Sequence, residues 1–136
     1  MVYTATNINN SATIVAQTGT TVTTPVDVRG KAVKYDSSGN VVLASTVGEI
    51  VVGIAILTND ETVKAGDDVH IQVKDIGVAL AGSAIAVGDE LTADADGKVK
   101  KATDGDFVIA TALESAGADG KYIRVQITKY VKPSKA

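Results

Sequence analysis

Two stretches of the chain have closely similar sequences: GEIVVGIAI at residues 48–56 and GDFVIATAL at residues 105–113. Each begins with glycine and an acidic residue and continues as a run of mostly Val, Ile and Ala. β-Branched residues fit a pleated, buried surface, and a glycine inside the run is typical of a bend. The two stretches therefore predict strands in a chain that repeats one β unit, the first of them either buried on both faces or bent at Gly53.

The similarity continues on both sides of these stretches. Residues 30–33 align with 88–91, the Asp-x-x-Gly turn of residues 36–39 aligns with that of 94–97, and residues 66–73 align with 120–127. The spacing between aligned residues decreases from 58 to 54 along the chain, so the second repeat is shorter by a few residues. These deletions fall between strands, where loops tolerate them. We expect repeats at 30–74 and 88–128 inside one β-barrel domain, residues 25–130.

Further strands follow from alternation and turn residues. Residues 33–43 and 91–100 predict hairpins, and in residues 68–74 Val69, Ile71 and Val73 face inward while His70 faces outward. Residues 77–81 and 122–130 complete the set, and single helical turns could form at 46–48 and 114–117. The predicted fold class is all-β: a small β-barrel or β-sandwich with an internal repeat of about 55 residues and an extended N-terminal arm. Because each half has an apolar face that it cannot cover alone, we expect the two sheets to close over a shared interior.

Composition narrows the classes of function. The chain has 136 residues, a net charge of −3, no cysteine and few aromatic residues, so disulfides are excluded and nucleic acid is a poor partner. No apolar run approaches the roughly 20 residues of a membrane span, and the N-terminus lacks the features of a secretion signal. We expect a protein with no membrane and no nucleic-acid partner, made in a reducing cytoplasm.

The two ends of the chain differ from its body. No charged side chain precedes Asp27, and residues 1–24 are rich in Thr and Asn, which predicts an N-terminal arm or edge strand. Main-chain pairing needs no charged anchor, so this segment is suited to strand addition on a neighbour. Residues 131–136 form a basic tail that could contact an acidic surface.

The residues needed for catalysis or metal binding are not gathered in any motif. His70 is expected to be an exposed residue on the polar side of its strand. Because it is the only histidine and there is no cysteine, metal sites of the His/Cys type are excluded. The acidic turns at 94–97 and 104–106 lack the ligand spacing of a calcium loop, and the neighbouring carboxylates of Asp89 and Glu90 are expected in a turn. The sequence therefore predicts no catalytic residues, no cofactor, no metal and no enzyme activity.

The order of motifs in residues 77–127 resembles that of the capsid cement, or head decoration, proteins of tailed bacteriophages. The motifs are GVALAG at 77–82, AVGDEL at 86–91, DGKV at 96–99, residues 107–113, and YIRV at 122–125. One departure is that the family's Gly-x-Ala reads Ala110-Thr-Ala112 here, while the first repeat keeps it as Gly53-Ile-Ala55. The departure concerns a local bend rather than the fold.

The resemblance implies a homotrimer on the outer surface of the virion capsid that binds the major capsid protein and stabilises contacts between its subunits. Candidate capsid or subunit contacts lie in the arm and the tail: Thr4, Thr6, Asn7, Asn9, Asn10, Thr13, Lys132 and Lys135. The alternative is a carbohydrate-binding or adhesin-like β module of a virion fibre or cell surface, which would require exposed aromatic residues over a groove.

Overall fold

The structure, a computed structural model, describes residues 11–134, and within them it contains β-strands and no helix. The first five strands are β1 (Thr13–Gln17), β2 (Ala32–Tyr35), β3 (Val41–Leu43), β4 (Gly53–Ala55) and β5 (Asp68–Gln72). The next five are β6 (Ile76–Leu80), β7 (Glu90–Ala93), β8 (Val99–Lys101), β9 (Phe107–Ala112) and β10 (Tyr122–Val131). The predicted all-β class is confirmed, and residues 46–48 and 114–117 form turns and bends rather than helical turns.

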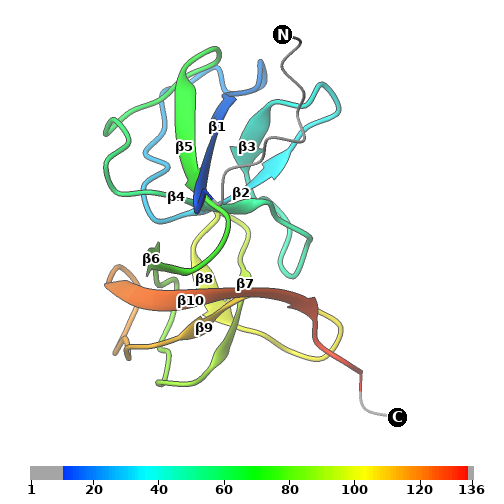
Figure 1. Cartoon of the computed structure of the whole chain (residues 1–136), viewed down its shortest axis with the longest axis vertical. Helices are drawn as coiled ribbons and strands as arrows, with labels where there is room; N and C mark the ends of the chain where they lie inside the picture. The colour runs from blue at the N-terminus through cyan, green and yellow to red at the C-terminus, as the bar shows by residue number, and fades with distance from the viewer. Residues whose placement is uncertain (1–10, 135–136) are drawn as a thin grey trace, which may run out of the picture.

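The strands form two antiparallel sheets with the same topology. Their orders are β1-β5-β4-β2-β3 and β6-β10-β9-β7-β8. Parallel bridges between Thr18 and Val41, and between Ala81 and Val99, join the first strand of each sheet to its last and curl the sheet on itself. Figure 1 shows the result as two lobes, one above the other. Residues 11–74 are called the first lobe and residues 75–134 the second lobe below.

Glycine turns stand at equivalent places in the two lobes. Eight glycines have positive φ, a conformation that strains other L-residues, and they fall into four equivalent pairs. The pairs are Gly30 and Gly88, Gly39 and Gly97, Gly48 and Gly105, and Gly66 and Gly120. The correspondence also includes the first strand of each lobe, because Ala16 pairs with Val69 of β5 as Ala79 pairs with Ile123 of β10. Each lobe is therefore one complete copy of the five-stranded unit.

The apolar interior is divided between the lobes and is shared only in part. One cluster of buried residues belongs wholly to the first lobe and contains Val28, Val33, Val41, Ala55, Val63, Val69 and Ile71. The other is centred on the second lobe and includes Leu91, Ile109 and Ile123, with Ala32, Ala44, Val51 and Ile54 contributed by the first lobe. The expected single interior is thus two cores that meet where the lobes join.

The lobes differ in the length of the last strand. β10 continues past a bulge, where Lys129 has a φ of 48°, so that Tyr130 and Val131 pair with Val108 and Phe107 of β9. β5 stops at Gln72, and the chain then turns into β6. The stretch at residues 48–56, expected to be one strand, forms strand only at Gly53–Ala55, because β5 ends before it could pair with residues 50–52.

Four backbone hydrogen bonds join the lobes. Ala32 N–H donates to Gly97 O over 2.7 Å, and Leu80 N–H donates to Gly30 O over 2.7 Å. Gly48 accepts from Phe107 N–H at 3.0 Å and donates its own N–H to Ala93 O at 3.1 Å. These bonds define the junction between the lobes and fix their relative position.

The close approach of β5 to Gly53 gives a stability test. A Cβ built on Gly53 would overlap the backbone of Gln72, whereas the equivalent Ala110 carries its Cβ in the second core. We expect Gly53→Ala to lower the free energy of unfolding by about 2–3 kcal/mol, through overpacking against backbone that cannot move aside. The reciprocal control Ala110→Gly should cost about 1 kcal/mol. Chemical unfolding of both variants measures this, and a Gly53→Ala variant as stable as the parent would contradict the packing described.

Candidate interaction surfaces

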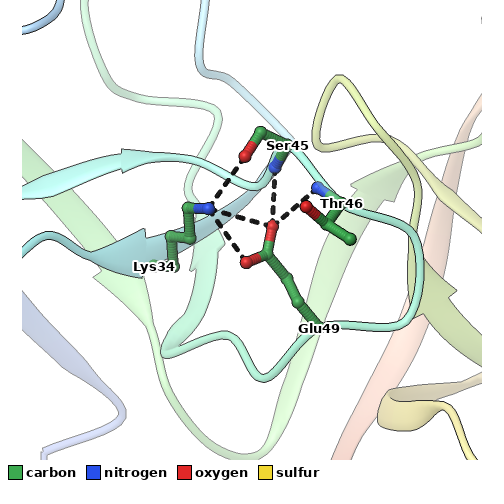
Figure 2. Close-up of polar contacts among 4 residues, drawn as sticks. All are labelled: Lys34, Ser45, Thr46 and Glu49. Atoms are coloured by element: carbon green, nitrogen blue, oxygen red, sulfur yellow. Dashed lines mark hydrogen bonds and ion pairs between the residues drawn. The ribbon is translucent and has the colours of Figure 1, made fainter.

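A polar cluster holds the loop between β3 and β4 (Figure 2). The Lys34 ammonium on β2 donates to both carboxylate oxygens of Glu49, at 2.9 and 3.1 Å, and to Ser45 Oγ at 2.8 Å. The backbone N–H groups of Ser45 and Thr46 each donate to Glu49 Oε2 at 2.7 Å. Glu49 thus closes the loop on itself and ties it to the sheet; these four residues are called the brace.

The brace is electrostatically strong because it is partly shielded from water. Burial disfavours the charged form of Glu49, but the hydrogen bonds from Lys34 and from the Ser45 and Thr46 backbone outweigh it and hold the pKa of Glu49 below its ordinary value. Within and next to the held loop, the apolar side chains of Val47 and Ile50 point to solvent, and Ile50 is 71% exposed. The molecule therefore presents apolar side chains on a loop whose conformation is set in advance.

Two of the predicted contact residues lie in the described part of the chain. Thr13 is exposed at the start of β1, where its N–H and C=O both bond the Ser11 hydroxyl. Lys132 is half-buried, and its ammonium pairs with Glu90. The others, Thr4, Thr6, Asn7, Asn9, Asn10 and Lys135, lie outside the described residues. Thr13 and Lys132 belong to different lobes.

Glu90 is the centre of a second polar cluster that the sequence did not predict. Its carboxylate accepts hydrogen bonds from the Lys132 ammonium and from the Tyr130 hydroxyl. Those two bonds lower the pKa of Glu90. The prediction of a turn at Glu90 is wrong, because Glu90 is the first residue of β7 and fastens the C-terminal end of β10 to that strand. This contact depends on strand pairing, which the sequence alone did not show.

The acidic turn at Asp94–Gly97 is a hairpin turn in the structure. Asp94 Oδ1 accepts from the Asp96 N–H at 3.1 Å, as Asp36 accepts from Ser38 in the first lobe. Burial and then the neighbouring Asp96 raise the pKa of Asp94 to about 6. Within residues 11–134, no three His, Cys, Asp or Glu side chains gather as a metal site would require.

In the described part of the chain, no helix has the length and apolar character to cross a membrane. The described surface presents two β lobes with held loops and several exposed apolar side chains. A family model described as "phage cement protein" matches residues 5–127, which is most of the chain. The chain belongs to the phage cement protein family, whose members are structural proteins of the phage head.

A search of curated proteins finds no match. Among solved structures, the chain is similar to the N base of the head fiber gp8.5 of bacteriophage phi29. The TM-score is 0.62 at 22% identity, and the match covers 85% of this chain and 92% of the phi29 chain. At this identity the likeness concerns the fold, which is thus also found in a protein of a phage head.

The brace gives a pH-dependent test. We expect Glu49→Gln to lower the free energy of unfolding at neutral pH by about 1–2 kcal/mol, because three N–H donors lose a charged acceptor. A lowered pKa in the folded state gives stability that is present above the unfolded-state pKa and lost as pH falls through the folded one. The stabilities of the parent and the variant should therefore converge in acid, as pH falls through the lowered pKa of Glu49.

Urea unfolding at neutral and at acid pH measures this difference. The control is Glu61→Gln, at an exposed position, which should change stability by less than about 0.5 kcal/mol at either pH. A Glu49→Gln penalty that is equally large in acid would show that the charge of Glu49 is not what holds the loop.

Proposed function

We propose that the protein is a capsid decoration protein that binds the outer surface of a phage head and stabilises contacts between major capsid subunits. The family match over residues 5–127 carries the proposal. The proposal includes self-association as a homotrimer, synthesis in the host cytoplasm and no catalytic activity. A role in binding requires only a surface complementary to that of the partner. The polar clusters around Glu49 and Glu90 hold parts of this surface in place.

The structure supports this role through its rigidity. Backbone hydrogen bonds at the junction hold two similar lobes at one spacing, and the brace holds Val47 and Ile50 in place. A body that keeps its binding groups in fixed positions loses little conformational entropy when it binds. Several such contacts made at once by one oligomer reinforce each other, because each one after the first is intramolecular.

The N-terminal arm and the C-terminal tail are the proposed extensions of this body. The arm is uncharged and suited to strand addition, with Thr4, Thr6, Asn7, Asn9 and Asn10 as its proposed contacts. Thr13 continues the arm into β1. In the tail, Lys135 is the proposed capsid contact, whereas the Lys132 ammonium is already paired with Glu90 and would contribute through its aliphatic stem.

The alternative is a carbohydrate-binding or adhesin-like module, which would need exposed aromatic residues that are free to contact a sugar. Tyr130 donates its hydroxyl to Glu90, and the Tyr122 ring lies against Gly30 at the junction. Of the half-exposed tyrosines in the described residues, Tyr35 alone has neither role. Binding on a glycan array, with none to heads, would favour this alternative.

We expect saturable binding of the protein to bare, expanded heads and a higher melting temperature of the heads that carry it. Deleting residues 2–10 should weaken head binding about 10-fold or more, since it removes one of several linked contacts. The melting temperature of the subunit itself should change by less than about 2 °C, because the deletion stops short of β1.

Sedimentation with heads and calorimetry of the free subunit measure the two effects. A control that ends at Ser134 removes Lys135 and tests the tail separately. Absence of saturable binding by the parent, together with unchanged head melting, would exclude the proposed function. Equal losses in binding and in subunit stability would place the deleted residues in the fold instead.

A further inference from the structure

The junction between the lobes is heterologous: the two lobes use different surfaces, although they are copies of one unit. The first lobe contributes Gly30, Ala32 and Gly48. The second lobe contributes Leu80, Ala93, Gly97 and Phe107, which are the counterparts of Gln17, Tyr35, Gly39 and Ile50 in the first lobe. Each lobe therefore uses one of two surfaces and leaves the other uncovered.

The uncovered surface of the first lobe shows what the junction covers in the second. A Cβ built on Gly97 would come within 3.0 Å of the Ala32 carbonyl oxygen, whereas one built on its counterpart Gly39 would have no atom within 4 Å. Ala93 is buried and Phe107 half-buried, whereas their counterparts Tyr35 and Ile50 are 50% and 71% exposed. We call this surface, with Gln17 at its β1 edge, the open face of the first lobe.

The second lobe has the complementary uncovered surface. A Cβ built on Gly30 would meet the Tyr122 ring and the Leu80 backbone, whereas one built on its counterpart Gly88 would have no atom within 4 Å. Val87, beside it, is 66% exposed. Within residues 86–90, Ala86, Val87 and Gly88 are exposed, so this segment presents to solvent the same kind of glycine turn that the first lobe inserts into the junction.

The C-terminal segment covers one part of this surface. Gly48 N–H donates to Ala93 O across the junction, but its counterpart Gly105 N–H donates to Lys132 O of the same lobe. Glu90, with Tyr130 and Lys132 on its carboxylate, stands where the first lobe has the buried Ala32. The uncovered part is thus confined to the Gly88 side, and a contact there is smaller than the junction.

We propose that a second copy of the chain binds head to tail, with its residues 86–90 covering the open face of the first lobe. The contact repeats the one that Gly30 makes with Leu80 inside the chain, with Gly88 O of one copy accepting from Gln17 N–H of the next. Val87 of one copy then covers apolar surface near Val15, which is 55% exposed at the β1 edge. This deepens the self-association in the proposed function and rests on it.

Heterologous contacts leave one unused face at each end unless the copies close into a ring. A ring uses every open face once, and a three-membered ring is the proposed homotrimer.

Crosslinking tests the direction of the contact, because the chain has no cysteine of its own. Gln17→Cys and Val87→Cys are made in separate chains, co-expressed, purified together and treated with a short bismaleimide. We expect a crosslinked dimer when both variants are present and none when either is alone. The control replaces Gln17→Cys with Ile76→Cys. Ile76 is 59% exposed but belongs neither to the open face of the first lobe nor to residues 86–90. The mixed sample should exceed this control about five-fold or more, since only a bound pair gives a high effective concentration.

Native mass spectrometry of the parent is expected to show the trimer. A monomer, crosslinks in a single-variant sample, or equal yields in the test and control pairs would each overturn the head-to-tail contact. Head binding by a monomer would leave the decoration function standing but remove both this inference and the proposed homotrimer. A crosslinked ring that does not bind heads would support this inference and exclude the decoration function.

Discussion

The shape of the molecule depends on main-chain hydrogen bonds between two copies of one unit. Each of these bonds joins backbone atoms: the N–H groups of Ala32, Leu80 and Phe107 donate, and Gly48 uses both its N–H and its C=O. The main chains of the two lobes must therefore lie within hydrogen-bond distance of each other. Glycine permits this at Gly30, where the Tyr122 ring and the Leu80 backbone occupy the space of a side chain. If the lobes shifted, these backbone groups would lose their hydrogen-bond partners, which costs free energy. The junction therefore fixes the relative position of the lobes more than it adds buried apolar surface.

This constraint explains why the two halves have diverged where they have. Residues in the junction are small or buried in one lobe, as Ala32 and Ala93 are, while their counterparts Glu90 and Tyr35 are polar or exposed. The strand lengths diverge for the same reason: β5 must leave its sheet to begin the second lobe, whereas β10 is free to continue along β9. A protein that works by adhesion gains from such a body, because two lobes of one scaffold present different surfaces at a fixed spacing.

The sequence predicted the parts of the fold that local chemistry determines. Glycine and aspartate marked the turns at residues 36–39 and 94–97, and alternation placed Val69 and Ile71 inside. It did not show that β1 belongs to the repeat, because β1 and β6 share little beyond Val-Ala. The brace was also out of reach, since Lys34 meets Glu49 only once strand pairing is known. Of the predicted contacts, Lys132 has an internal partner, and most of the others lie outside the described residues.

Amide hydrogen exchange measured by NMR tests the central claim, that backbone bonds lock the two lobes together. The N–H groups of Ala32, Leu80 and Phe107 are expected to exchange as slowly as those of the core residues Ile71 and Ile109, through unfolding of the whole chain. Exchange of the three junction amides at the rate of loop amides, with the core still protected, would mean that the lobes separate in solution and would contradict the account.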